Sequence, residues 1–172
     1  MRQVSLRPHD VAVALELALR PGESFTPLAE AVGLSLSEAH AAVGRLTHAS
    51  LLRQAERRIV PSALLDFLVT GAPHAFPAML GPETRGVPTA AAAALLATEF
   101  PNAERHVWPS AEGLARGPSL TPLYPKAVRL PGSQPDLYGL LTLVDALRVG
   151  RARERTRAAE VLAQHLRGAT AP

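Results

Sequence analysis

Proline spacing is the feature that most limits how this chain can fold. Ten of its sixteen prolines fall between residues 73 and 131. Proline fixes φ and has no amide hydrogen, so prolines this frequent prevent long regular elements. Residues 71–133 are nevertheless too apolar for a flexible linker, with aromatic residues spread among the prolines. We therefore expect three zones: a helical start, an ordered but irregular middle, and a helical end.

The first zone, residues 1–70, begins with a clear helix pattern. Pro8 opens a run whose apolar residues recur at spacings of three and four, and Pro21-Gly22 ends it. Thr26 followed by Pro27 predicts a second, short helix, with Thr26 as its cap and Gly33 just past its end. Helix, short helix and turn are thus expected within the first 35 residues.

A third helix and a small β-ribbon are expected next. Ser35 and Ser37 are candidate caps, and the spacing of Ser35 to Glu38 fits a capping box. Residues 51–53 and 57–61 read as two short strands around a tight turn, followed by a helix over residues 62–70. This order of elements is typical of a winged helix-turn-helix, in which the third helix projects outward and can enter the major groove of DNA.

The run LAEAVGLSLSEAHAAVGRLTHASLLRQAERRIV, residues 28–60, carries a resemblance to a known group of proteins. It resembles the signature of MarR-like and IclR-like winged-helix regulators, and it covers about a fifth of the chain. The resemblance implies binding of double-stranded DNA, regulation of transcription, and a homodimer acting on two half-sites. The run over residues 28–60 also departs from that signature, because Ala41, Ala42 and Gly44 stand where such regulators commonly carry polar or basic residues. We therefore expect limited reading of base edges.

The expected DNA-binding residues fall into three groups. Hydroxyl groups near helix starts suit phosphate oxygens, outward residues of the third helix suit the groove, and ribbon arginines suit the backbone. Arg45 and His40 are the strongest candidates for direct contact. The complete set is Thr26, Ser35, Ser37, His40, Ala41, Arg45, His48, Arg53, Arg57 and Arg58.

The second half offers candidates for a partner or effector. Two Arg-Gly units recur, at Arg85 and Arg116, each followed closely by proline. Trp108 and Tyr124, together with Tyr138, could line a pocket beside them, although a place in the core is the alternative for all three. An alanine-rich helix is expected near residues 89–100.

A pair of helices, interrupted near Gly150, is expected over residues 134–167. Asp145 and Arg148 lie three residues apart there, and we expect an exposed ion pair between them. The arginine-rich run from 148 to 157 is expected to be hydrated. The predicted fold class is thus mainly α with a small β-wing: a winged helix-turn-helix domain at 1–70, then a proline-rich middle and a C-terminal helical pair at 71–172 for dimerisation or partner binding.

Composition excludes several functional classes. With no cysteine, the chain has no thiolate metal site, cysteine nucleophile or disulfide. No phosphate-binding glycine motif, nucleophile elbow or zinc-binding helix motif occurs, and the six histidines are scattered. We expect no enzyme activity, no metal and no cofactor. No apolar run is long enough to span a membrane, so a cytoplasmic protein with no membrane partner is expected.

Charge favours local rather than global attraction to nucleic acid. The net charge is +3, and residues 1–70 are balanced, with seven arginines against seven acidic residues. Affinity for DNA must therefore come from patches such as Arg45, Arg53, Arg57 and Arg58. The expected function is a DNA-binding transcriptional regulator. The alternative is a protein-interaction module, such as the antitoxin-like partner of a bacterial toxin, because a simple regulator needs no such proline-rich extension.

Overall fold

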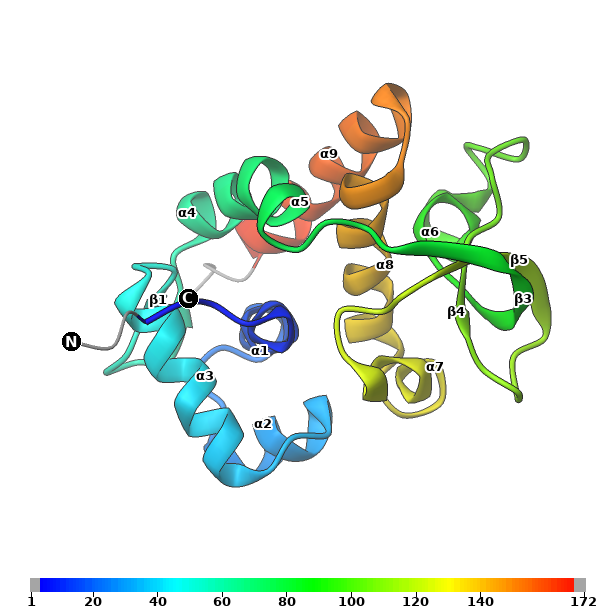
Figure 1. Ribbon diagram of the computed structural model, residues 1–172. Coiled ribbons are helices and arrows are strands. Elements are labelled where there is room, and N and C mark those ends of the chain that lie inside the picture. The colour runs from blue at the N-terminus through cyan, green and yellow to red at the C-terminus, as the bar shows by residue number, and fades with distance from the viewer. Residues whose placement is uncertain (1–3, 169–172) are drawn as a thin grey trace.

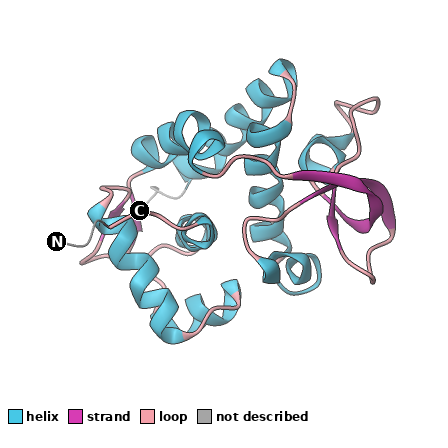
Figure 2. Cartoon of the chain, viewed as in Figure 1, coloured by secondary structure: helices cyan, strands magenta, loops and turns pink. Residues whose placement is uncertain are grey.

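The computed structural model describes residues 4–168 and shows a mainly helical chain with two small sheets (Figures 1 and 2). The elements of the first part are α1 (Pro8–Leu19), α2 (Phe25–Val32), α3 (Leu36–His48), β1 (Leu52–Arg53) and β2 (Arg58–Ile59). They follow one another in the order that the sequence predicts. The next segment comprises α4 (Pro61–Asp66), a π-helical turn (Phe67–Gly71) and α5 (Ala72–Ala75).

The elements of the remaining part are β3 (Leu80–Pro88), a 3-10 turn (Ala90–Ala92), α6 (Ala94–Ala97), β4 (Val107–Pro109), β5 (Ala115–Leu120), a 3-10 turn (Pro125–Arg129), α7 (Leu130–Ser133), α8 (Pro135–Val149) and α9 (Ala152–Gly168). In Figure 1, α8 lies between the N-terminal helices and the sheet formed by β3, β4 and β5. Within residues 4–168, no helix is both long enough and apolar enough to cross a membrane.

Local signals place the ends of α2 and α3. The Ser35 hydroxyl accepts the Glu38 backbone N–H (3.2 Å), and the Glu38 carboxylate accepts the Ser35 backbone N–H (2.9 Å), which confirms the capping box. Gly33 ends α2 with φ of 78°, a conformation that favours glycine. The prediction that Thr26 caps α2 is wrong. The helix begins one residue earlier than Thr26, and Ser24 occupies the cap position without a side-chain hydrogen bond.

The helical segment after the ribbon is longer than predicted. It runs as α4, the π-helical turn and α5 from residue 61 to residue 75, past the predicted end near residue 70. Phe67 and Phe76 meet edge to face across this segment, with ring centroids 6.3 Å apart. The expected boundary between the two parts of the chain therefore falls inside a helical segment.

The middle of the chain is more regular than the prolines suggest. β3 pairs antiparallel with both β4 and β5, and a single parallel pair, Val107 with Ser119, closes the three strands on themselves. The prediction of an irregular middle is wrong because prolines are tolerated at strand ends and in such small, bulged sheets. The predicted helix over residues 89–100 is also reduced, to a 3-10 turn and the four-residue α6.

The two Arg-Gly units explain how these strands approach one another. Gly86 and Gly117 are buried, and a Cβ on either would overlap a backbone carbonyl, that of Trp108 or that of Arg105 respectively. Only glycine fits at such a contact. Because side chains alternate along a strand, the preceding Arg85 and Arg116 point to the outer face, where both are exposed.

One hydrophobic cluster joins both halves of the chain. Residues 10–18 of α1 and nine residues of α8 are buried, and α1 packs directly on α8. Trp108 and Tyr124 are 1% and 5% exposed, so their alternative interpretation as core residues is confirmed. Tyr138 is only partly buried, meets Trp108 edge to face, and packs against the same cluster.

The C-terminal helical pair confirms the predicted break, since α8 ends at Val149 and α9 begins at Ala152. The ion pair between Asp145 and Arg148 is present, with Nη1 to Oδ1 at 2.6 Å, but it is buried rather than exposed. The two side chains are 1% and 4% exposed. Arg148 was expected to be hydrated, and it instead points inward because backbone carbonyls of Phe76 and Pro77 accept its remaining N–H groups.

Candidate nucleic-acid interface

The outward face of α3 is accessible along its length. The opposite face carries the buried residues Ala39, Ala42, Val43 and Leu46, which pack against α1, α2 and β1. The exposed residues of α3 are Leu36, Ser37, Glu38, His40, Ala41, Gly44 and His48. The expected groove-facing positions, Ser37, His40, Ala41 and His48, therefore share one solvent-exposed surface. Figure 1 shows α3 at the edge of the molecule, away from the β3–β4–β5 sheet.

Arg45 does not belong to this exposed surface, so the expectation that it points outward from α3 is wrong. Its guanidinium donates to both oxygens of Asp10, from Nε to Oδ2 at 2.7 Å and from Nη2 to Oδ1 at 2.6 Å. The arginine side chain is 13% exposed and the aspartate 1%. Hydrogen bonding to Asp10 raises the pKa of Arg45 further above its ordinary value. The pair fixes α3 against α1.

Asp10, the residue that positions Arg45, was missed by sequence reasoning. It is an acidic residue in an otherwise apolar run of α1, and its Oδ2 also accepts the Arg7 backbone N–H at the start of that helix (2.8 Å). His9 lies beside the pair, with its Nε2 3.1 Å from Arg45 Nη2. Burial lowers the pKa of His9. A single carboxylate within an apolar helix face is the signal that could have identified this position.

The start of α3 is partly occupied by its own cap. The Ser35 hydroxyl donates to the Glu38 carboxylate (2.6 Å), and hydrogen bonds from Ser35 lower the pKa of Glu38. Both serines are exposed, but Ser35 is engaged within the chain, whereas Ser37, in the first turn of α3, makes no side-chain hydrogen bond within residues 4–168. The negative charge of Glu38 favours the helix start electrostatically and disfavours a phosphate at the same place.

An aromatic contact organises the approach to α3. The ring of Phe25, at the start of α2, stacks on His40 with centroids 3.5 Å apart. The Arg57 guanidinium lies 5.3 Å from the centre of the same Phe25 ring. Sequence reasoning missed Phe25. Phe25 lies two residues before Pro27 and belongs to no clear apolar pattern or motif, so the sequence gave no reason to single it out.

The ribbon arginines divide into two kinds. Arg57 is partly buried, with φ of 46°, and donates to the backbone carbonyls of Glu23 (2.8 Å) and Gly22 (3.1 Å). It holds the ribbon to the α1–α2 turn and is not available to DNA as expected. Arg53 and Arg58 are exposed and stand directly opposite one another on β1 and β2. Within residues 4–168, neither makes a side-chain hydrogen bond or ion pair.

The candidates in the second half are also divided. Trp108 and Tyr124 are buried, so neither contacts a partner directly as proposed for them. Arg85 and Arg116 are exposed and are opposite partners in the β3–β5 ladder. The structure thus contains two cross-strand arginine pairs, Arg53 with Arg58 and Arg85 with Arg116. Glu83 lies on the same strand face as Arg85, two residues away, and reduces the positive charge there.

Metal chemistry finds no support among the described residues. In residues 4–168, no three His, Asp or Glu side chains come together in an arrangement that could hold a metal ion. Comparison of the chain with protein-family models, curated protein sequences and solved structures gives no significant match, so the functional argument depends on the residues themselves.

Proposed function

We propose that residues 1–70 form a winged helix-turn-helix that binds double-stranded DNA and that the chain regulates transcription as a homodimer. In this proposal α3 is the recognition helix, and the β1–β2 ribbon is the wing. The order α1, α2, α3, ribbon supports it, as do the Gly33 turn and the accessible outer face of α3. Two half-sites about one helical turn apart would match a dimer with two-fold symmetry.

The observation that carries the proposal is the pair formed by Arg53 and Arg58. Like charges directly opposite on a two-stranded ribbon destabilise it by about 0.2–1 kcal/mol. An anion between the two guanidinium groups removes that repulsion, and a phosphate of the DNA backbone suits the geometry of arginine. Since both side chains are exposed and without partners among the described residues, the ribbon is free to take that phosphate.

The α3 surface indicates which kind of binding to expect. With Arg45 paired to Asp10, the outer face of α3 holds no free arginine or lysine in the described chain. Ser37, His40 and His48 are the polar groups left to reach base edges or phosphates. Binding is therefore dominated by backbone contacts, with modest direct reading of sequence.

Fluorescence anisotropy with a labelled duplex from upstream of the chain's own gene tests this proposal. We expect Arg53→Ala combined with Arg58→Ala to weaken binding and to reduce the salt dependence by about one phosphate contact per chain. The matched control is Arg151→Ala with Arg153→Ala, which removes the same charge from exposed positions at the start of α9. Equal losses in the two double variants, or no binding by the unmodified chain at low salt, would refute the proposal.

A protein-interaction module is the second candidate, and the composition of α3 favours it. Leu36 is 50% exposed, and Ala41 and Gly44 are also exposed on α3, so apart from Glu38 the exposed face of the helix carries no carboxylate, arginine or lysine side chain, and it offers apolar surface to a protein partner. Co-expression with the product of the adjacent gene, followed by size-exclusion chromatography, tests this candidate. It predicts a complex that Leu36→Glu disrupts and that Arg53→Ala with Arg58→Ala leaves intact.

A further inference from the structure

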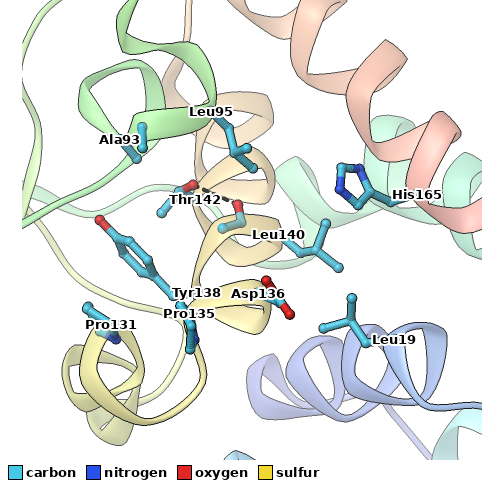
Figure 3. A pocket seen from close by; sticks show the side chains of 12 residues that line it. Leu19, Ala93, Leu95, Pro131, Pro135, Asp136, Tyr138, Leu140, Thr142 and His165 are labelled. Atoms are coloured by element: carbon cyan, nitrogen blue, oxygen red, sulfur yellow. Dashed lines mark hydrogen bonds between the residues drawn. The ribbon is translucent and has the colours of Figure 1, made fainter.

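A cavity of about 550 Å³ lies where the end of α1 meets α6, α7, α8 and α9 (Figure 3). Its size falls within the range of pockets that hold small organic ligands, about 300–1,000 Å³. Most of its wall is apolar, and its apolar residues include Leu19, Ala93, Ala94, Leu95, Pro131 and Leu140. Leu95 is 40% exposed at this site.

Two hydroxyl groups of the lining already donate hydrogen bonds to backbone carbonyls of the chain. The Tyr138 hydroxyl donates to the Pro88 carbonyl at 2.6 Å, and the Thr142 hydroxyl donates to the Gly139 carbonyl at 2.7 Å. Burial raises the pKa of Tyr138 to about 12, so it keeps this proton at neutral pH. Each hydroxyl therefore has only lone pairs to offer a ligand.

Asp136 and His165 are the two other polar side chains of the lining. His165 Nδ1 lies 2.9 Å from the Val161 carbonyl oxygen, which can only accept, so Nδ1 carries a hydrogen and is already engaged. The Asp136 carboxylate is exposed and makes no hydrogen bond or ion pair within the described chain. Figure 3 shows both side chains bordering the opening beside Leu140, one from α8 and one from α9.

We propose that this cavity binds a small organic ammonium ion, with the apolar body of the ligand against Leu19, Leu95 and Leu140 and its N–H groups donated to Asp136. The lining supplies one negative charge, on Asp136, and the Tyr138 and Thr142 hydroxyls supply acceptors rather than donors. A carboxylate or phosphate ligand would meet repulsion from Asp136. A neutral apolar molecule would fill the space without gaining an ion pair with that carboxylate.

Isothermal titration of the full chain with three compounds of one shape tests the charge requirement. The probes are 1-naphthylmethylammonium, the neutral 1-naphthylmethanol, and the anionic 1-naphthylacetate. We expect the ammonium to bind at least about tenfold more tightly than the alcohol, as one charge-assisted hydrogen bond implies, and the acetate not to bind. Equal binding of ammonium and alcohol, or no binding of the ammonium, would overturn the proposal.

Variants locate the site. Asp136→Asn should lower the affinity for the ammonium about tenfold and leave that for the alcohol unchanged. Glu112→Gln, an exposed carboxylate in the β4–β5 connection, is the matched control and should change neither. Ala94→Trp places a large side chain on the exposed, cavity-lining side of α6 and should abolish binding of both compounds. If Ala94→Trp folds and still binds, or if Asp136→Asn binds like the unmodified chain, the assignment to this cavity is wrong.

Discussion

Within residues 4–168, two arginine–aspartate pairs have a buried carboxylate, one in each half of the chain, and they differ in what they connect. Asp10 and Arg45 lie 35 residues apart, on α1 and α3, and their pair joins two helices. Asp145 and Arg148 lie three residues apart on α8, and their pair directs the arginine toward the segment before β3. The first pair sets the position of the exposed helix, and the second holds the proline-rich middle against the core.

The two aspartates also differ in how many groups support them. Asp10 has one further donor, the Arg7 backbone N–H. Asp145 has two, the Thr89 hydroxyl at 2.7 Å and the Trp108 indole N–H at 2.6 Å. Burial raises the pKa of Asp145, and its three side-chain donors act against that shift. Each aspartate is 1% exposed and accepts three hydrogen bonds, which a buried carboxylate needs, but Asp145 receives them from three side chains and Asp10 from one side chain and one backbone N–H.

The largest effect is expected from breaking the deeper pair. Asp145→Asn leaves the Arg148 guanidinium buried without a counter-charge, which costs about 3–5 kcal/mol in a protein interior. We expect the free energy of unfolding to fall by that amount in urea titrations followed by fluorescence of Trp108, the single tryptophan. The control Glu112→Gln, at an exposed carboxylate, should change stability by less than about 0.5 kcal/mol. An unchanged midpoint for Asp145→Asn would show that this pair does not hold the middle of the chain.

Breaking the first pair should cost less. Arg45→Met retains the side-chain volume and removes the charge, while Asp10 keeps its backbone donor from Arg7. Asp10 loses two of its three hydrogen bonds, but Arg45 is 13% exposed where Arg148 is 4% exposed, so solvent is closer to this pair, and we expect a loss of about 1–3 kcal/mol. His48→Ala on the exposed face of α3 is the control and should be nearly neutral. If Arg45→Met proves as damaging as Asp145→Asn, the exposure of the arginine does not distinguish the pairs.

The contrast between the pairs also shows what the sequence could predict. The Ser35–Glu38 capping box and the Gly33 end of α2 are contacts within five residues, and both were correctly predicted. Arg45 was misplaced because its partner lies 35 residues away, so its spacing on α3 alone could not show that it points inward. Arg148 was misplaced although its ion-pair partner was identified. Burial there depends on carbonyls more than 70 residues distant, at Phe76 and Pro77.

The sheet of the middle zone was missed for a related reason. Strand prediction relies on alternating apolar residues, and β3 and β5 instead contain few apolar residues, with one Arg-Gly unit and at least one proline in each. The repeated Arg-Gly unit was visible in the sequence, but its meaning depends on another strand lying against each glycine. The accessible surface of α3 followed from helix periodicity, whereas the cavity beside Asp136 forms where five helices meet and has no sequence pattern.

Glu16 on α1 is a third buried carboxylate, and it extends the comparison because only one of its two oxygens has a hydrogen-bond donor. Arg20 pairs with one oxygen, and the other oxygen, Oε2, is buried with no partner in the described residues. Burial raises the pKa of Glu16 above its ordinary value, with Arg20 acting against it. The unfolded chain therefore loses this proton at a lower pH than the folded chain. Ionisation favours unfolding, so this group makes stability fall as pH rises from about 4 toward its folded pKa.

Glu16→Gln should remove that pH dependence. The measurement is the free energy of unfolding in urea at a series of pH values. The value for the variant minus the value for the unmodified chain should increase as pH rises above about 4. Glu30→Gln, at an exposed carboxylate on α2, is the control and should follow the unmodified chain. If the difference between Glu16→Gln and the unmodified chain stays constant with pH, burial is not what controls this carboxyl.

The smallest effect is expected at the exposed arginines, where no buried charge is involved. Arg85 and Arg116 stand opposite one another on β3 and β5, so repulsion between their positive charges lowers the stability of the folded sheet. Arg116→Glu replaces this repulsion by a cross-strand ion pair with Arg85, although Glu83 on the same face lessens the gain. We expect thermal unfolding at low ionic strength to show stabilisation of about 0.2–1 kcal/mol, shrinking at 1 M salt as screening shortens to about 3 Å. Arg116→Gln should lie between the two, and a loss of stability in Arg116→Glu would show that the outer face of this sheet is not governed by charge.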